Sequence, residues 1–151
     1  SLNNLALLYD NQGKYAEAEP LYVRALSIYE QELGATHPST ASSLNNLAVL
    51  YDHQGKYAEA EPLYVRALQI REQELGATHP DTALSLNDLA GLYQSQGKYA
   101  EAEPLYQRAL SIYEKTVGSQ HPYTQQIRQN YAALLRAMER DDEVKQIEEK
   151  Q

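Results

Sequence analysis

Residues 55–68 read GKYAEAEPLYVRAL, and the same run of residues stands at 13–26. A third copy occupies 97–110 with one change, glutamine in place of valine at position 107. Shifting the sequence against itself by 42 positions aligns residues 1–42 with 43–84 at 36 of 42 positions. The chain is therefore built from a repeated unit. A fixed period of this length is the signature of repeat architectures, in which each unit packs on its neighbours.

Each unit predicts two amphipathic helices. The first, helix A, carries apolar residues at the i, i+3, i+4, i+7 spacing of one helical face: Leu44, Leu47, Ala48 and Tyr51. Gly55 then provides a turn, and helix B begins near Tyr57 with a broader apolar face. We expect helix B to run to about Leu75, because the next helix breaker is Gly76.

Two local signals mark the ends and the middle of these helices. The run Thr78-His79-Pro80-Asp81 predicts a polar cap followed by proline in the first turn of the next helix A. Pro62 lies inside helix B, where proline removes a backbone hydrogen bond. Since the apolar face continues through Pro62, we predict a slight kink there and no helix end.

The repeated positions resemble the tetratricopeptide repeat signature, with Leu44 where that family usually has tryptophan. The 42-residue period and the Leu-Gly-x-x-His-Pro run indicate the kinesin-light-chain-like subgroup. This resemblance implies an all-α fold, an α-solenoid of antiparallel helix pairs forming a right-handed superhelix. It predicts one array over residues 1–151, with repeats at about 1–38, 39–80 and 81–122 and a degenerate capping repeat at 123–151.

The resemblance also implies a function without catalysis. Members bind a protein or an extended peptide in a concave groove lined by the A helices, and we expect no enzyme activity, no cofactor and no metal. Carried onto this chain, the groove consists of five sets of equivalent residues: Asn3, Asn45, Asn87 and Gln129; Asn4, Asn46 and Asp88; Leu7, Val49, Gly91 and Ala133; Asp10, Asp52 and Gln94; Asn11, His53 and Ser95.

Asparagine amides both donate and accept hydrogen bonds, so a ladder of them can grip a peptide backbone while the apolar strip contacts its side chains. The alternative is that these asparagines only join helices or face water. The groove lacks the lysine and arginine set with which some members clamp a terminal carboxylate. Its aspartates favour a neutral or basic peptide over an acidic one.

Composition narrows the partners further. With 13 basic and 21 acidic residues, the formal net charge is −8, which disfavours nucleic acid and anionic membrane surfaces. There is no cysteine for a disulfide or thiolate metal site, and no apolar run approaches the roughly 18 residues of a membrane helix. We expect a soluble protein, with the cytoplasm as the default location.

Two groups that suggest chemistry have simpler interpretations. His37, His79 and His121 recur once per repeat, too far apart for one shared ion, so we predict a capping or packing role. The paired glutamates on helix B, such as Glu59 and Glu61, lie near a helix N-terminus, where negative charge is favourable.

A structural alternative remains for the function. Near-identical units can stack end to end, and a chain that starts inside a repeat exposes Leu2, Leu5 and Tyr9 to another molecule. We expect the chain to be a fragment of a longer protein. A consensus-designed origin stays open because the units are so alike, although the eroded fourth unit favours natural divergence.

Overall fold

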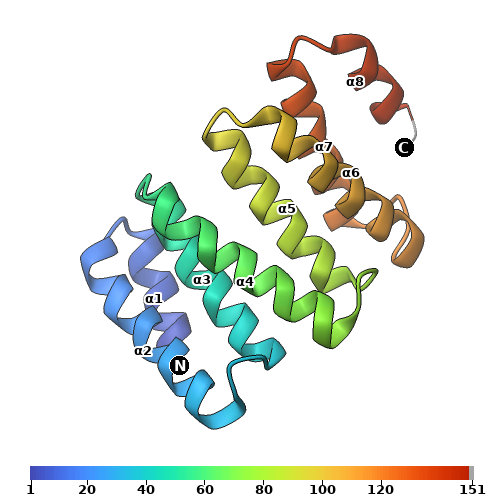
Figure 1. The fold of residues 1–151 in the computed structure, drawn as a ribbon. Coiled ribbons are helices and arrows are strands. Elements are labelled where there is room, and N and C mark those ends of the chain that lie inside the picture. Colours follow the sequence, from blue (N-terminus) through green and yellow to red (C-terminus); the bar gives the residue numbers. More distant parts are fainter. Residues whose placement is uncertain (150–151) are drawn as a thin grey trace. The chain divides into compact units, whose positions relative to one another are not determined.

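The computed structural model describes residues 1–149, and this part of the chain is all-α. It divides into two compact units, Ser1–Gly76 and Ala77–Gln151. The first contains α1 (Leu2–Asn11), α2 (Tyr15–Leu33), α3 (Pro38–His53) and α4 (Tyr57–Leu75). The second contains α5 (Pro80–Ser95), α6 (Tyr99–Thr116), α7 (Pro122–Ala137) and α8 (Asp141–Glu148) (Figure 1).

The odd-numbered helices are the predicted A helices and the even-numbered ones the B helices. In each unit every helix packs on the next one along the chain, and the two A helices also touch, α1 with α3 and α5 with α7. The predicted all-α solenoid of helix pairs is confirmed. The single array over 1–151 with its four repeat boundaries stays a prediction, as does the right-handed superhelix, and the last two residues of the predicted capping repeat lie outside the described residues.

Three A helices begin in the same way. The Nδ1 atom of His37 accepts a hydrogen bond from the backbone N–H of Ser39 at 3.0 Å, and Pro38 is the first helical residue of α3. His79 and His121 cap α5 and α7 identically, each followed by proline. The predicted capping role of the repeated histidines is therefore confirmed. It satisfies one of the backbone donors that a helix start leaves open.

The B helices continue through their prolines, as predicted. The helices α2, α4 and α6 contain Pro20, Pro62 and Pro104 in their interiors without ending there. The slight bend expected at these positions stays a prediction. Helix α4 ends at Leu75, and Gly76 follows with a φ of 103°, so the predicted end of helix B is also confirmed.

The core of the first unit is distributed between neighbouring helices. One cluster joins α1, α2 and α3 through buried apolar side chains, and a second joins α3 to α4; they comprise Ala6, Ala18, Tyr22, Leu47 and Leu50, and Ala41, Leu44, Ala67 and Ile70. Leu26 and Leu63 are partly buried, and each packs against both clusters. Small alanines let the helices approach closely while tyrosine and leucine fill the wider gaps.

The last helix pair departs from the pattern in sequence but keeps the turn. Glu139 stands 42 positions after Gly97, and its φ of 59° places it in the same left-handed region as Gly97 at 75°. Helix α8 then spans only Asp141–Glu148, with Val144 buried. Arg128 takes the place of Leu44 and Leu86; its side chain is 1% exposed and pairs with Glu114 at 3.1 Å.

Repeated polar contacts join helix B of a helix pair to the loop that precedes helix A of the same pair. Arg66 of α4 donates to the backbone oxygen of Ala35 at 3.3 Å, and Arg108 of α6 donates to that of Ala77 at the same distance. The two arginine donors are 42 residues apart, and so are the two alanine acceptors.

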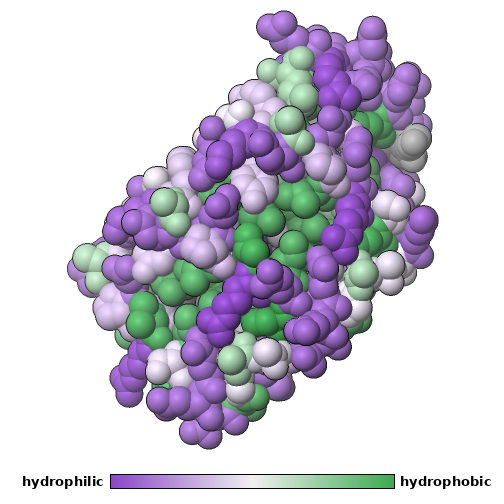
Figure 2. Space-filling model, viewed as in Figure 1, coloured by the Kyte–Doolittle hydropathy of each residue, from purple (hydrophilic) through white to green (hydrophobic). Residues whose placement is uncertain are grey.

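Hydrophilic side chains surround the hydrophobic patches on the face shown in Figure 2.

Candidate functional site

The residues predicted for the groove all lie on A helices. Apart from Ala133, which is exposed, there are sixteen of these residues. Of the sixteen only Asp10 is buried, and the other fifteen keep part or all of their surface exposed. In the first unit they come from α1 and α3, which touch; in the second they come from α5 and α7, which also touch. Each unit thus brings its own subset of predicted residues onto adjacent helices.

Asp10 has an internal partner. Its side chain is 1% exposed, and its Oδ1 atom lies 2.9 Å from Nδ1 of His53 on the next A helix. Burial raises the pKa of the Tyr22 hydroxyl, and the charge of Asp10 raises it further. Asp10 therefore lies between helix B of its own repeat and helix A of the next, where it joins helices and is hidden from a ligand.

The equivalent positions in later repeats also face a tyrosine of helix B. Burial raises the pKa of Asp52, while the nearby His53 and a hydrogen bond from Tyr64 oppose that change. The hydroxyl of Tyr106 donates to Oε1 of Gln94 at 2.8 Å. Both Asp52 and Gln94 are half-buried. Each side chain therefore hydrogen-bonds to a tyrosine of helix B and still keeps part of its surface exposed.

In the second unit, Asn87 of α5 is paired with a residue of α7 other than the predicted Gln129. Nδ2 of Asn130 donates to Oδ1 of Asn87 at 3.1 Å, whereas Gln129 is exposed. Asn130 was missed as a site residue although it stands 42 positions after Asp88. The side-chain bond between α5 and α7 favours a helix-joining role for Asn87, which was the alternative considered for this ladder.

The apolar strip differs along the repeats. Leu7 on α1 is 50% exposed, and Val49 on α3 is half-buried. The equivalent residue on α5 is Gly91, and Ala133 on α7 is exposed. The first unit therefore offers branched apolar side chains beside its asparagines, and the second offers almost none.

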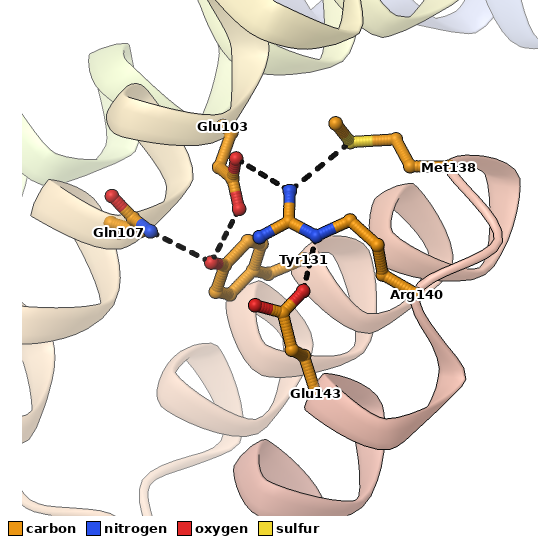
Figure 3. A network of polar contacts seen from close by, with 6 residues as sticks. All are labelled: Glu103, Gln107, Tyr131, Met138, Arg140 and Glu143. Atoms are coloured by element: carbon orange, nitrogen blue, oxygen red, sulfur yellow. Dashed lines mark hydrogen bonds and ion pairs between the residues drawn. The ribbon is translucent and has the colours of Figure 1, made fainter.

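A polar network that sequence reasoning missed lies between α6, α7 and α8 (Figure 3). The hydroxyl of Tyr131 donates to Oε2 of Glu103 at 3.0 Å and accepts from Gln107 at 2.9 Å. Arg140 donates to Oε1 of Glu103 at 2.8 Å and also pairs with Glu143. These bonds raise the pKa of Arg140 and lower that of Glu143.

Two residues of this network can be recognised when the last repeat is compared with the one before it, because they differ from the repeated residues. Tyr131 stands where Leu89 stands one period earlier, and Arg140 stands where Lys98 does. Lys98 lies over the ring of Tyr93 at 5.8 Å from its centroid, but the residue equivalent to Tyr93 in the last pair is Leu135. Arg140 instead reaches the carboxylate of Glu103 on the preceding helix B. Beside it is a cavity of about 300 Å³.

Other kinds of site find little support in residues 1–149. This part of the chain contains no group of three or more histidine, cysteine, aspartate or glutamate side chains placed to hold a metal ion. Among the described helices, none has the length and apolar character needed to cross a membrane. The repeated histidines already serve as helix caps.

The antiparallel helix pairs, with polar side chains left uncovered along the A helices, define an α-helical repeat protein of the solenoid class. The Tetratricopeptide repeat family model matches residues 1–73, 53–115 and 81–150. The chain belongs to the tetratricopeptide repeat family. This family is one of non-catalytic scaffolds that generally mediate protein interactions.

Solved structures place the chain near kinesin-light-chain-like repeats. A kinesin-light-chain-like protein of Podosopora anserina with nearly identical TPR-like repeats is 29% identical and superposes with a TM-score of 0.89, covering 99% of this chain and 71% of that one. A variant of it gives 28% identity, the same TM-score, and coverage of 99% and 70%. BtubC (BKLC) from P. vanneervenii is 28% identical with a TM-score of 0.86, covering 98% of this chain and 58% of that protein. No curated protein matches the chain.

Proposed function

We propose that this chain binds an extended, neutral or basic peptide segment of a partner protein along the exposed faces of its A helices. One observation carries the proposal. The packing positions Leu44, Leu47 and Ala48 are buried, while the predicted contact residues between them on α3 keep exposed surface. One face of an A helix therefore packs in the core, and a second face, rich in amide groups, keeps surface exposed to solvent.

The contacts favour a particular subset of the predicted residues. Asp10 is hidden, and Asn87 is bonded to Asn130, so their first role is to join helices. Asn4 is exposed and Asn46 is half-buried; they lie on adjacent helices of the first unit, each three residues before an apolar side chain, Leu7 or Val49. Amides at these positions can bond to a peptide backbone while the apolar side chains contact its side chains.

Charge supports the preference for a neutral or basic peptide. The chain carries a net charge of −8, and α1, α3 and α5 contain no lysine or arginine. Asp52 and Asp88 are half-buried on α3 and α5. An acidic peptide would therefore meet like charge, whereas a basic one would associate faster at low salt.

Selection from a random dodecapeptide library tests the proposal. The chain is compared with an Asn4→Ala, Asn46→Ala variant and with a Gln69→Ala, Gln73→Ala control, which removes two exposed amides from α4. We expect the chain and the control to enrich the same peptides and the asparagine variant to lose them. Equal enrichment by all three proteins, or enrichment by none, would contradict binding on the A-helix face.

A second candidate function is end-to-end self-association. Leu5 and Leu8 on α1 are 42% and 51% exposed, whereas their equivalents on α3, Leu47 and Leu50, are 5% and 0% exposed. A cavity of about 180 Å³ between α1 and α2 is lined by Leu2 and Ile28 among others. If assembly is the function, sedimentation should show growth with concentration, and a Leu5→Gln, Leu8→Gln variant should remain a monomer.

A further inference from the structure

His53 differs from the other three histidines of the chain in the ring nitrogen that carries its hydrogen. In His37, His79 and His121, Nδ1 accepts a hydrogen bond from a backbone N–H, so that nitrogen carries no hydrogen. Nδ1 of His53 instead lies 2.9 Å from Oδ1 of Asp10, and a carboxylate can only accept. Nδ1 of His53 therefore carries the hydrogen, and Nε2 of the neutral ring is an acceptor.

Among residues 1–149, His53 is the one hydrogen-bond donor that reaches the side chain of Asp10. That side chain is 1% exposed, and its Oδ2 atom is buried without a hydrogen-bond partner. In the next repeat the equivalent residue, Asp52, is instead bonded by Tyr64 of helix B. Because hydrogen bonds to an ionised acceptor are roughly twice as strong as neutral ones, Asp10 holds the imidazole of His53 in one orientation.

The opposite edge of the His53 ring faces the surface. The side chain is 48% exposed, although the carboxylate in contact with its Nδ1 edge is buried. Within the described part of the chain, the bond to Asp10 is the only hydrogen bond of this ring. His53 lies four residues after Val49 and seven after Asn46, which places all three on one face of α3. This face therefore ends in an acceptor of fixed orientation.

We propose that His53 is a specificity-determining residue of the first unit, and that its Nε2 atom accepts a hydrogen bond from one backbone N–H of the bound peptide. The amide of Asn46 can bond to a backbone N–H or C=O, whereas Nε2 only accepts. His53 therefore sets the register of the peptide. Proline has no backbone N–H, so it is excluded from the peptide position opposite His53.

Asp10 is a positioning residue in this arrangement, because it is hidden from the peptide and acts only through His53. Both residues belong to the first unit, so the contact does not depend on the second. The inference rests on the proposed peptide-binding function and adds which peptide group the end of α3 recognises.

Nitrogen-15 NMR of the histidine rings tests the orientation of His53 without any ligand. Neutral rings of the three capping histidines should carry their hydrogen on Nε2, and one further ring should carry it on Nδ1. That one signal should be absent from His53→Gln. In Asp10→Asn the new amide can donate to Nδ1, so the ring should move towards the form with hydrogen on Nε2. A His53 ring that already has this form in the unchanged chain would overturn the proposal.

Backbone methylation of a bound peptide tests the acceptor. A peptide enriched from the dodecapeptide library is measured by fluorescence anisotropy, together with versions that are methylated at one backbone nitrogen at a time. In the chain, one methylation should weaken binding by about threefold to tenfold, as for the loss of one neutral hydrogen bond. The same methylation should have little effect in a variant that combines His53→Phe with Asp10→Asn and is folded by circular dichroism. Enriched peptides should lack proline at the methylated position.

Acid should weaken this peptide, because a doubly protonated ring donates from Nε2 and meets the peptide N–H as a second donor. Binding is compared at pH values near 8 and near 5, the range in which histidine charge usually changes. The other titratable groups around the pair are Tyr22 of α2, which the charge of Asp10 affects, and Asp52 of α3 with its partner Tyr64. They are retained in His53→Gln, which should lose most of the pH dependence.

The outcomes separate this inference from the function on which it rests. Equal weakening by methylation in both proteins, or an unchanged pH dependence in His53→Gln, contradicts the acceptor role and leaves binding on the A-helix face intact. If no peptide is enriched by any of the proteins, the proposed function fails and the role of His53 fails with it.

Discussion

Nδ1 of His53 lies 2.9 Å from Oδ1 of Asp10, 43 residues earlier in the chain, and this contact joins the A helices of two successive repeats. The carboxylate is 1% exposed, while the imidazole is half open to solvent. The contact is specific to this pair of repeats, because serine stands at position 95 where histidine stands at 53.

Removing His53 should therefore destabilise the first unit. His53→Ser takes a partner from a buried carboxylate, and an unsatisfied buried polar group costs about 1–3 kcal/mol. Urea unfolding followed by circular dichroism measures the change. His53→Ser combined with Asp10→Asn should recover part of the loss, since a neutral amide is less costly to bury than a carboxylate. Additive losses in the double variant would show that the two side chains do not interact.

The histidine cap of α5 gives a second prediction. His79→Ala removes the acceptor for the N–H of Asp81, and loss of an N-cap acceptor typically costs about 1 kcal/mol. His79→Asn should retain most of the stability because asparagine is a strong N-cap residue. The exposed neighbour Thr78 provides the control, and Thr78→Ala should leave the denaturation midpoint unchanged.

Two tyrosines should titrate late in alkali. Burial, together with nearby carboxylates, raises the pKa of Tyr51 and of Tyr106 to about 12 from an ordinary value of 10. Each group is protonated more readily in the folded state than in the unfolded one. Its contribution to stability is therefore complete below pH 10 and is lost as the pH rises from 10 towards 12.

Absorbance near 295 nm against pH measures this behaviour. The folded chain should show part of its tyrosinate signal appearing only near pH 12, and Tyr106→Phe should reduce that late fraction. Tyr123 is 56% exposed, so Tyr123→Phe is the control and should leave the late fraction intact. A late fraction of the same size in Tyr106→Phe would contradict the buried hydroxyl described for α6.

Gly91 should be a position where stability can be raised. Gly91→Ala is expected to stabilise the second unit by roughly 0.5–1 kcal/mol, because the helix backbone there accepts any residue and the added methyl group meets only an ordinary contact. Gly97→Ala is the matched control; with a φ of 75° it should destabilise instead. Thermal unfolding of both variants decides the prediction, and a loss of stability in Gly91→Ala would show that the methyl group does not fit.

Glu139 should behave in the opposite way to Gly91. Its φ of 59° places a side chain in the left-handed region, which costs about 1–2 kcal/mol for residues other than glycine. Glu139→Gly restores the residue of the other turns and should stabilise the last helix pair by about 1 kcal/mol. Hydrogen exchange resolved by helix measures the gain, which should appear as slower exchange in α7 and α8; unchanged exchange there would contradict a strained turn.

Sequence patterning is sufficient for the helices of this chain because every decisive signal is local and repeated. Apolar spacing, the glycine turns and the His-Pro starts each act within a few residues. Because each signal occurs in three copies, it cannot be a chance occurrence. The prolines show the limit of local rules: Pro62 alone argues against a helix, and the packing of the continuous apolar face overrides it.

Side-chain partners on the A helices were harder to predict. The period places Asn87 and Gln129 at equivalent positions, but it is Asn130 that donates a hydrogen bond to Asn87, because two packed helices are offset in a way that the period does not specify. The network of Glu103, Tyr131 and Arg140 depends on two departures from the repeat, so a search for equivalent residues does not find it.

The hydrogen bonds between helix B and the loop before helix A have a consequence for how such a protein can change. Arg66 donates to Ala35 and Arg108 donates to Ala77, so donor and acceptor of each bond recur together with the 42-residue period. A duplication or loss of 126 nucleotides of coding sequence, three per residue, would add or remove one whole bond of this kind and leave the others complete. Array length is thus a trait that recombination between near-identical copies can alter in single steps, while changes such as that from Val49 to Gly91 accumulate separately in each copy.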